Sequence, residues 1–181
     1  MCIRDRYGNM DMEEKLAFLD EHYLSHFDYL DVDSVIQEQK AFGACQDVTL
    51  EYPVAENEGE EDNTYLSYNM VVGNAADSQM AMAFEVLDYA LLSAPGAPLK
   101  QALLDVKAGK DVYGSYDDGI LQPYFTVIAK GSNPDRKEEF VSVIRQVLGD
   151  IVKNGIDRKA VEAGINYFEF RYRCLLYTSD A

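Results

Sequence analysis

The feature that most constrains the fold is a stretch of ten residues, 64–73, in which side chains alternate in character. Every second side chain is apolar or aromatic and would lie on one side of an extended chain: Leu66, Tyr68, Met70 and Val72. A two-residue period belongs to a β-strand with one buried and one solvated face. Antiparallel sheets commonly expose one face in this way, so the stretch predicts a sheet with its core on a single side.

Helical patterns flank this strand along the chain. Asp11, Asp77 and Asp157 each precede a run with apolar residues three or four apart, and aspartate is a preferred N-cap. Pro98 stands where a short helix can begin, and Gly155 stands where a long one can end. Helices are predicted over about residues 11–27, 77–93, 98–103, 135–154 and 157–173.

Three further strands are predicted over residues 47–52, 112–116 and 123–129. The last two flank a turn at Asp117-Asp118-Gly119 and read as a hairpin, with Pro123 at a strand start where its missing donor is tolerated. Pairs of strands alternate with pairs of helices. This order predicts an α+β fold, an antiparallel-rich sheet with helices packed on one face.

The two ends carry no such pattern. Residues 1–6 run abruptly into the first helix, and residues 174–181 follow the last helix just as abruptly. Both resemble translated adapter sequence, so we expect them to be non-native and to play no part in the fold. Residues 7–173 remain, with Cys45 as the remaining cysteine of three.

Charge narrows the class of protein. The chain of 181 residues has a net charge of −16, which argues against nucleic acid and against an anionic membrane surface as partners. Residues 7–63 hold 16 acids against 2 bases, while residues 64–173 are nearly balanced. The longest apolar runs are too short to span a bilayer, and three cysteines make no disulfide framework. We therefore expect a soluble, cytoplasmic protein.

Few residues suggest chemistry. His22 and His26 are spaced to share one helical face and could bind a metal, but neither an HExxH nor an HxxEH glutamate is present between them, so two solvated surface histidines are expected. Cys45 has no nearby base to activate it and is expected to be an inert buried thiol. The acidic residues 51–62 fit a solvated loop, and Asp117-Asp118 fits a turn. Gly109-Lys110 lacks the rest of a phosphate-binding loop.

Several longer stretches resemble the insulinase (pitrilysin-type) zinc metallopeptidases, in particular their presequence-protease branch. The resemblance runs from about Tyr7 to Arg173 and rests on a combination of segments, none of which is a catalytic signature. The segments are SAPGAPLKQAL at 93–103, GKDV at 109–112, GS at 114–115, QPYF at 122–125 and EAGINYFEFRYR at 162–173.

The resemblance implies a metallopeptidase-like α/β roll and a much longer parent. Family members contain four related α+β domains in two bowl-shaped halves that enclose peptides, with zinc on an HxxEH helix of the first domain. By similarity, residues 7–33 would be the closing helix and linker of that first domain. Residues 34–173 would be the second, non-catalytic domain.

The repeated fold places the helix of residues 80–93 where the first domain has its zinc helix. Laid on the HxxEH pattern, Glu85 and Tyr89 stand in the places of the two histidines, and Asp88 in that of the glutamate. A phenol is a poor zinc ligand, so a structural helix without metal is expected. The sequence therefore assigns no catalytic, metal-binding or cofactor-binding residue, and zinc is expected only in the parent enzyme.

Two functions follow as hypotheses. In the first, the chain is a fragment of a zinc metalloendopeptidase that degrades unstructured peptides, inactive alone and forming part of the chamber wall. Its partners would be the other domains of the parent and peptides, with the acidic half favouring basic ones. In the alternative, the chain is a stand-alone acidic module that binds peptides or assembles without catalysis.

Overall fold

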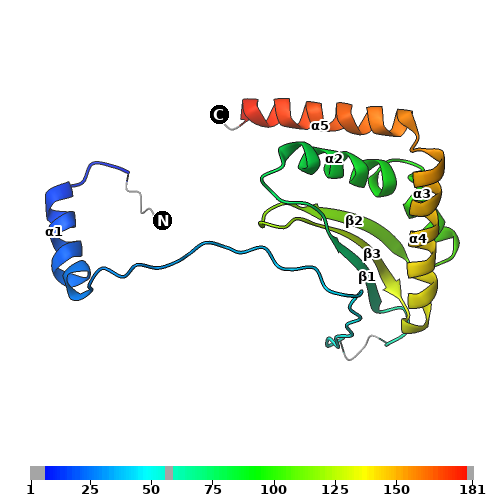
Figure 1. Cartoon of the computed structure of the whole chain (residues 1–181), viewed down its shortest axis with the longest axis horizontal. Helices are drawn as coiled ribbons and strands as arrows, with labels where there is room; N and C mark the ends of the chain where they lie inside the picture. Colours follow the sequence, from blue (N-terminus) through cyan, green and yellow to red (C-terminus); the bar gives the residue numbers. More distant parts are fainter. Residues whose placement is uncertain (1–6, 56–58, 179–181) are drawn as a thin grey trace. The chain divides into compact units, whose positions relative to one another are not determined.

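The structure is a computed structural model that describes residues 7–55 and 59–178, with side chains described as far as residue 174. The chain divides into two units, residues 1–37 and residues 38–181 (Figure 1). None of the helices within the described ranges is long and apolar enough to cross a bilayer.

The first unit is a short helical segment. Helix α1 spans Met12–His22, and the Oδ1 atom of Asp11 accepts a hydrogen bond from the Glu14 amide at 3.0 Å, which confirms the predicted N-cap. The helix ends earlier than predicted because Tyr23 leaves helical geometry, at φ −134° and ψ −63°. A single 3-10 turn, η1 (Leu24–His26), follows. Neither element has a buried residue.

The second unit is built on a three-stranded antiparallel sheet. Its strands are β1 (Thr64–Val71), β2 (Asp111–Asp117) and β3 (Tyr124–Ser132), in the spatial order β1-β3-β2. Leu66 and Val112 both pair with Ala129 across the sheet, so the apolar residues of all three strands share one face. The predicted hairpin and the predicted alternation in residues 64–73 are therefore confirmed.

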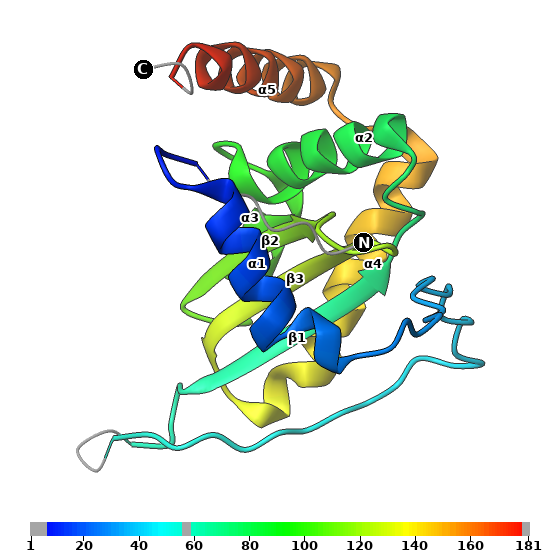
Figure 2. The same cartoon turned by 90° about the vertical axis from the view of Figure 1, so that its left-hand side faces the viewer.

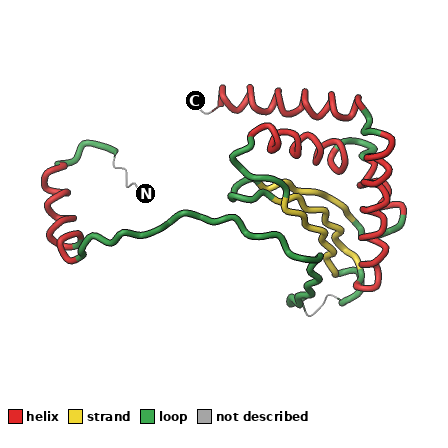
Figure 3. The backbone as a smooth tube through the Cα atoms, viewed as in Figure 1, coloured by secondary structure: helices red, strands yellow, loops and turns green. Residues whose placement is uncertain are grey.

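The strand predicted at residues 47–52 is wrong. This segment has no regular secondary structure, and within the described residues no backbone hydrogen bond joins it to a strand (Figure 3). Val48 and Leu50 are 72% and 83% exposed. An alternating pattern of apolar side chains indicates that a segment can form a strand. The strand forms only where a neighbouring strand pairs with its backbone.

Helices cover one face of the sheet (Figures 1 and 2). They are α2 (Ser78–Asp88), which continues as the π-helical turn η2 (Tyr89–Ser93), then α3 (Pro98–Asp105), α4 (Lys137–Asn154) after the 3-10 turn η3 (Pro134–Arg136), and α5 (Arg158–Thr178). The Asp77 and Asp157 carboxylates accept hydrogen bonds from the amides of Met80 and Lys159, as predicted. Gly155 ends α4 at φ 85°.

The core lies between this sheet face and the helices. Its members from the strands are Leu66, Val112, Phe125, Val127 and Ala129, and those from the helical layer are Leu91, Leu92, Leu99, Leu103, Phe140 and Ile144. The other sheet face carries the exposed residues Ser67, Tyr113, Ser115 and Lys130. This arrangement confirms the α+β class with helices on one face.

Two glycines set the spacing on either side of α2 and η2. A Cβ atom added to Gly114 of β2 would lie 2.3 Å from Asp88 Oδ1 and 2.3 Å from Leu92 Cδ1. A Cβ atom added to Gly164 of α5 would lie 3.2 Å from Tyr89 Cδ1 and from Val86 Cγ1. The helix therefore packs directly against β2 below and against α5 above, as Figure 1 shows.

Replacing Gly114 by alanine is expected to lower the free energy of unfolding of the full chain by about 1–3 kcal/mol. The new methyl group would overlap Leu92, which is 1% exposed and has little room to move in a packed core. Urea unfolding followed by circular dichroism measures the change.

The matched control is Gly149→Ala in the interior of α4, where an added Cβ meets nothing within 4 Å. Alanine is the better helix former there and should stabilise the chain by roughly 0.5–1 kcal/mol. Equal gains at both glycines would show that α2 does not depend on the close approach at Gly114.

Candidate functional site

The candidate site is the helix formed by α2 and η2, where the sequence places Glu85, Asp88 and Tyr89. The helix widens at its end into a π turn, in which the Ala94 amide donates to the Tyr89 carbonyl at 2.7 Å. Turns of this kind are frequent at functional sites, so the contacts of each of the three side chains decide what the helix does.

Glu85 faces α5. Its Oε2 atom accepts a hydrogen bond from the Tyr172 hydroxyl at 2.6 Å. This bond to a carboxylate raises the pKa of Tyr172 to about 12, with smaller effects from burial and from the negative charge of Glu85. Because Tyr172 stays protonated, its hydroxyl keeps donating to the Glu85 carboxylate. This charge-assisted hydrogen bond links α2 to α5.

Asp88 faces the sheet. Its Oδ1 atom is buried without a hydrogen-bond partner in the described structure, and it lies in the space that a side chain at Gly114 would fill. Its Oδ2 atom has one long contact with the Ser93 hydroxyl, at 3.5 Å. Burial raises the pKa of Asp88 above its ordinary value, and the Ser93 contact offsets only part of that effect. The carboxyl group is therefore half-buried, with Oδ1 directed toward the sheet.

Tyr89 packs through its ring. It stacks on Tyr167 of α5 with ring centroids 5.0 Å apart and planes inclined by 19°. Glu85 and Tyr89 thus contact α5, while Asp88 contacts β2, so the three groups do not converge on one point. The described residues contain no group of three or more His, Cys, Asp or Glu side chains that could hold a metal. The residues on this helix do not fit a zinc site.

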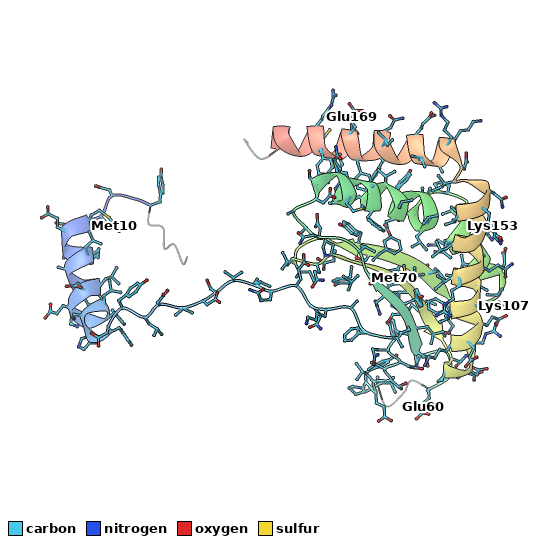
Figure 4. All side chains as sticks on the ribbon, in the orientation of Figure 1. Met10, Glu60, Met70, Lys107, Lys153 and Glu169 are labelled. Atoms are coloured by element: carbon cyan, nitrogen blue, oxygen red, sulfur yellow. The ribbon has the colours of Figure 1, made fainter. Side chains whose placement is uncertain are left out.

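A groove of about 370 Å³ lies between α2 and α5, the two upper helices in Figure 4. Val86, Ile165 and Phe168 give it an apolar lining, and Glu85 and Glu169 stand at its edges. The pattern of α5 predicted its apolar stripe, but not which helix the stripe would contact. Sequence reasoning missed this groove because its two sides lie about 80 residues apart in the chain.

A second cluster that sequence reasoning missed surrounds Tyr116, near the end of β2. Phe84 of α2 stacks on its ring at 5.5 Å. Burial raises the pKa of Tyr116, and the negative charges of Asp118, Glu85 and Asp77 raise it further. Acidic groups from α2, its N-cap and the β2–β3 turn therefore gather at this end of the sheet, although the sequence located most negative charge before residue 64.

The remaining candidates have structural roles or none that is visible. His22 ends α1 and His26 lies in η1, so they do not share one continuous helix, and both are exposed. Asp117 Oδ1 accepts from the Gly119 amide at 3.0 Å, as expected for a turn, and Oδ2 accepts from the Tyr124 hydroxyl at 3.1 Å.

Cys45 corrects a prediction: the thiol expected to be buried is exposed, because the segment around it packs against no core. In the acidic loop, Glu56 and Glu58 lie outside the described residues, and Glu60 and Glu61 are exposed. Asp62 exchanges hydrogen bonds with Asn133 and pairs with Lys110 at 3.3 Å. The Asn133 bond and the Lys110 charge lower the pKa of Asp62.

Comparison with known proteins identifies the type of domain. The family model described as "Peptidase M16 inactive domain" matches residues 7–168. A solved inactive peptidase domain, from a Bordetella parapertussis protein assigned as a zinc protease, superposes with a TM-score of 0.52. It covers 60% of this chain and 59% of its own, at 13% identity, and so supports the fold alone.

Curated relatives are much longer than this chain. "Protein HypA" of Clostridium perfringens is 42% identical over 167 residues, which are 92% of this chain and 17% of the relative. "Presequence protease 1, chloroplastic/mitochondrial" of Arabidopsis thaliana is 29% identical over 171 residues, 92% of this chain and 16% of the relative. The chain thus spans about a sixth of the relatives it matches. Since the family model covers most of its residues, the chain belongs to the peptidase M16 family, in which it matches the inactive domain.

Proposed function

We propose that this chain is a non-catalytic part of a zinc-dependent metalloendopeptidase that degrades unstructured peptides. The observation that carries the proposal is the match of residues 7–168 to an inactive peptidase domain, in a chain that spans 17% of a relative of 42% identity. Within the longer protein, the segment would form part of the chamber wall and hold the catalytic domain in its working orientation.

The contacts of α2 support a structural role. Each of the three positions that would bear zinc-site chemistry packs against a neighbouring element, through Tyr172, Gly114 and Tyr167. Such contacts stabilise the layered arrangement of sheet, α2 and α5. They also direct these side chains to different neighbours, whereas a catalytic zinc site needs ligands that converge on one point and an open position for water.

The chain would comprise parts of two domains. Residues 7–33 would close a preceding domain and link it to this one, and residues 34–173 would make up the non-catalytic domain. Residues 1–6 and 174–181 would be non-native. The lack of a disulfide framework among three cysteines favours a reducing compartment such as the cytoplasm.

The chain alone is expected to bind no zinc and to hydrolyse no peptide. Metal analysis of the purified full chain after incubation with zinc, together with cleavage of a quenched fluorescent peptide, measures both. Stoichiometric zinc that is lost in Glu85→Ala or in His22→Ala would contradict the proposal and identify the ligand.

Reading the source DNA upstream of Tyr7 separates the stand-alone module from the fragment, because only the fragment predicts an encoded HxxEH helix.

Negative charge around residue 60 is expected to favour basic peptides in the longer parent enzyme. Glu60→Gln with Glu61→Gln should lower kcat/KM for a basic peptide by about 2–10-fold at low ionic strength, because an acidic face concentrates cationic ligands. Cleavage of a neutral peptide should not change. The control variant, Glu138→Gln with Asp150→Asn, removes two exposed acids from α4. An equal loss in both variants would contradict a local effect.

Replacing Asp88 by asparagine is expected to raise the free energy of unfolding at neutral pH. Burial raises the pKa of Asp88 above the 3.8 of an ordinary aspartate, so ionisation lowers stability as the pH rises from that value through the raised pKa. The stabilisation of Asp88→Asn relative to the natural chain should therefore grow across this window and stay constant above it.

Urea unfolding at acidic and neutral pH measures this dependence. Asp150→Asn, which removes an exposed carboxylate from α4, is the matched control. If Asp88→Asn were destabilising at neutral pH, the charged carboxylate would have a favourable partner and the structural account of α2 would be wrong.

A further inference from the structure

Strand β1 lies at the edge of the sheet. The sheet order β1-β3-β2 leaves β1 with a partner strand on one side, and within the described residues no strand lies on its other side. An edge strand presents a row of backbone donors and acceptors that can pair with a further extended segment. The β1 edge is eight residues long, from Thr64 to Val71, which is enough for a full strand.

Residues 47–54 have the chemistry of such a strand. Their apolar members recur at every second position, at Val48, Leu50, Tyr52 and Val54. The exposed fractions of these side chains are 72%, 83%, 50% and 38%, so the two that are nearer to β1 in the chain are the less exposed. Apolar side chains exposed at this spacing are costly in water and favour pairing with a sheet edge.

Contacts at both ends hold the surrounding segment along β1, running in the opposite direction. At one end, the Gln39 amide donates to Gln122 Oε1 at 2.6 Å, and Gln122 Nε2 donates to the Gln39 carbonyl at 3.2 Å. Gln122 lies just before β3, beside the end of β1, because Val71 pairs with Tyr124. Asn74 Nδ2 also donates to Glu38 Oε1 there, at 2.6 Å.

At the other end, Tyr52 meets the start of β1. Its ring packs edge-on against Tyr65, with centroids 5.9 Å apart, and its hydroxyl donates to the Asn63 carbonyl. An antiparallel neighbour of β1 would have this direction. If Tyr52 stays opposite Tyr65, the two-residue step places Leu50 opposite Ser67 and Val48 opposite Asn69.

One ion pair holds the segment away from the rest of that register. Lys137 Nζ contacts both carboxylate oxygens of Asp47. Lys137 begins α4 and lies near the end of β3, which pairs with the start of β1. The register above would instead place Asp47 opposite Met70, near the other end of β1. The pair is exposed on both sides, with 45% and 68% of the side-chain surfaces accessible, so it is a weak restraint.

We propose that residues 47–54 are the occupant of the β1 edge: they close onto it as a fourth, antiparallel strand, and the Asp47–Lys137 ion pair holds them open. Closure removes the free edge and joins the exposed apolar row of residues 48–54 to the outer sheet face beside Tyr65. The two end contacts keep the segment close to the edge, so closure requires only local rearrangement. The segment is thereby an internal competitor for any extended peptide that would add to β1.

Disulfide formation in the full chain tests the register. In a background with Cys2, Cys45 and Cys174 replaced by serine, Leu50→Cys with Ser67→Cys should oxidise to an intramolecular disulfide about tenfold faster than Leu50→Cys with Ser115→Cys. Ser115 is the matched control because it is an exposed serine on the same sheet face, two strands away on β2. Mass spectrometry and non-reducing gels measure both rates.

Loss of the restraint should favour closure. Lys137→Gln is expected to speed disulfide formation between the cysteines at positions 50 and 67 several-fold and to slow amide hydrogen exchange of residues 48–54. The reason is that the Asp47–Lys137 ion pair no longer holds the segment away from β1. Lys153→Gln, at the other end of α4, is the control and should change neither.

The proposal is overturned by equal cross-linking at Ser67 and Ser115, or by a rate that Lys137→Gln leaves unchanged or lowers. Cross-linked dimers in place of the intramolecular product would also overturn it, since the occupant would then be a second copy of the chain. Circular dichroism of each variant establishes that it is folded, and exchange measured without any cysteine substitution gives a reading that does not depend on those variants.

Discussion

The structure of residues 38–181 depends on close approach at two glycines. Gly114 lets the α2 helix lie directly on β2, with Leu92 and Asp88 over the space that a side chain would fill, and Gly164 lets α5 approach the other side of the same helix. Because α2 is held between these two contacts, the positions of its side chains are fixed by packing. The groove between α2 and α5, the Glu85–Tyr172 hydrogen bond and the stacked pair Tyr89–Tyr167 all follow from this spacing.

The same constraint explains why the helix does not resemble a metal site. Zinc ligands must converge on one point from one side of a helix, and an open coordination position must remain for water. Here Glu85 and Tyr89 contact α5 while Asp88 contacts β2. A buried carboxylate oxygen without a hydrogen-bond partner is normally a cost to the fold. The neighbouring core residues Leu91 and Leu92 are apolar and offer this oxygen no hydrogen bond.

The sequence predicted those parts of the fold that depend on neighbouring residues. Asp77 and Asp157 cap helices, Leu99 and Leu103 are buried on α3, and the hairpin of β2 and β3 forms around its Asp-Gly turn, because capping and turn geometry act over a few residues. The candidate helix was also located correctly. The contacts of its side chains were not, because Glu85 meets a residue 87 positions away and Asp88 meets Gly114 across the core. The predicted burial of Cys45 and the predicted strand at 47–52 were wrong for a related reason. Burial and strand pairing both require a packing partner, and the local sequence pattern does not show whether one is present.

That distinction bears on the most exposed part of the fold. A chain that spans about a sixth of its curated relatives can present edges and apolar surfaces that a longer chain covers. The β1 edge differs from such surfaces because a segment of suitable pattern is already attached beside it through Gln39 and Tyr52. Pairing within the chain requires no meeting of separate molecules, so its entropic cost is that of closing a short loop, which grows only slowly with length. An edge with a tethered partner is therefore less available to extended peptides than its exposed backbone suggests. Under the proposed closure, an extended peptide could add to β1 only by displacing this segment.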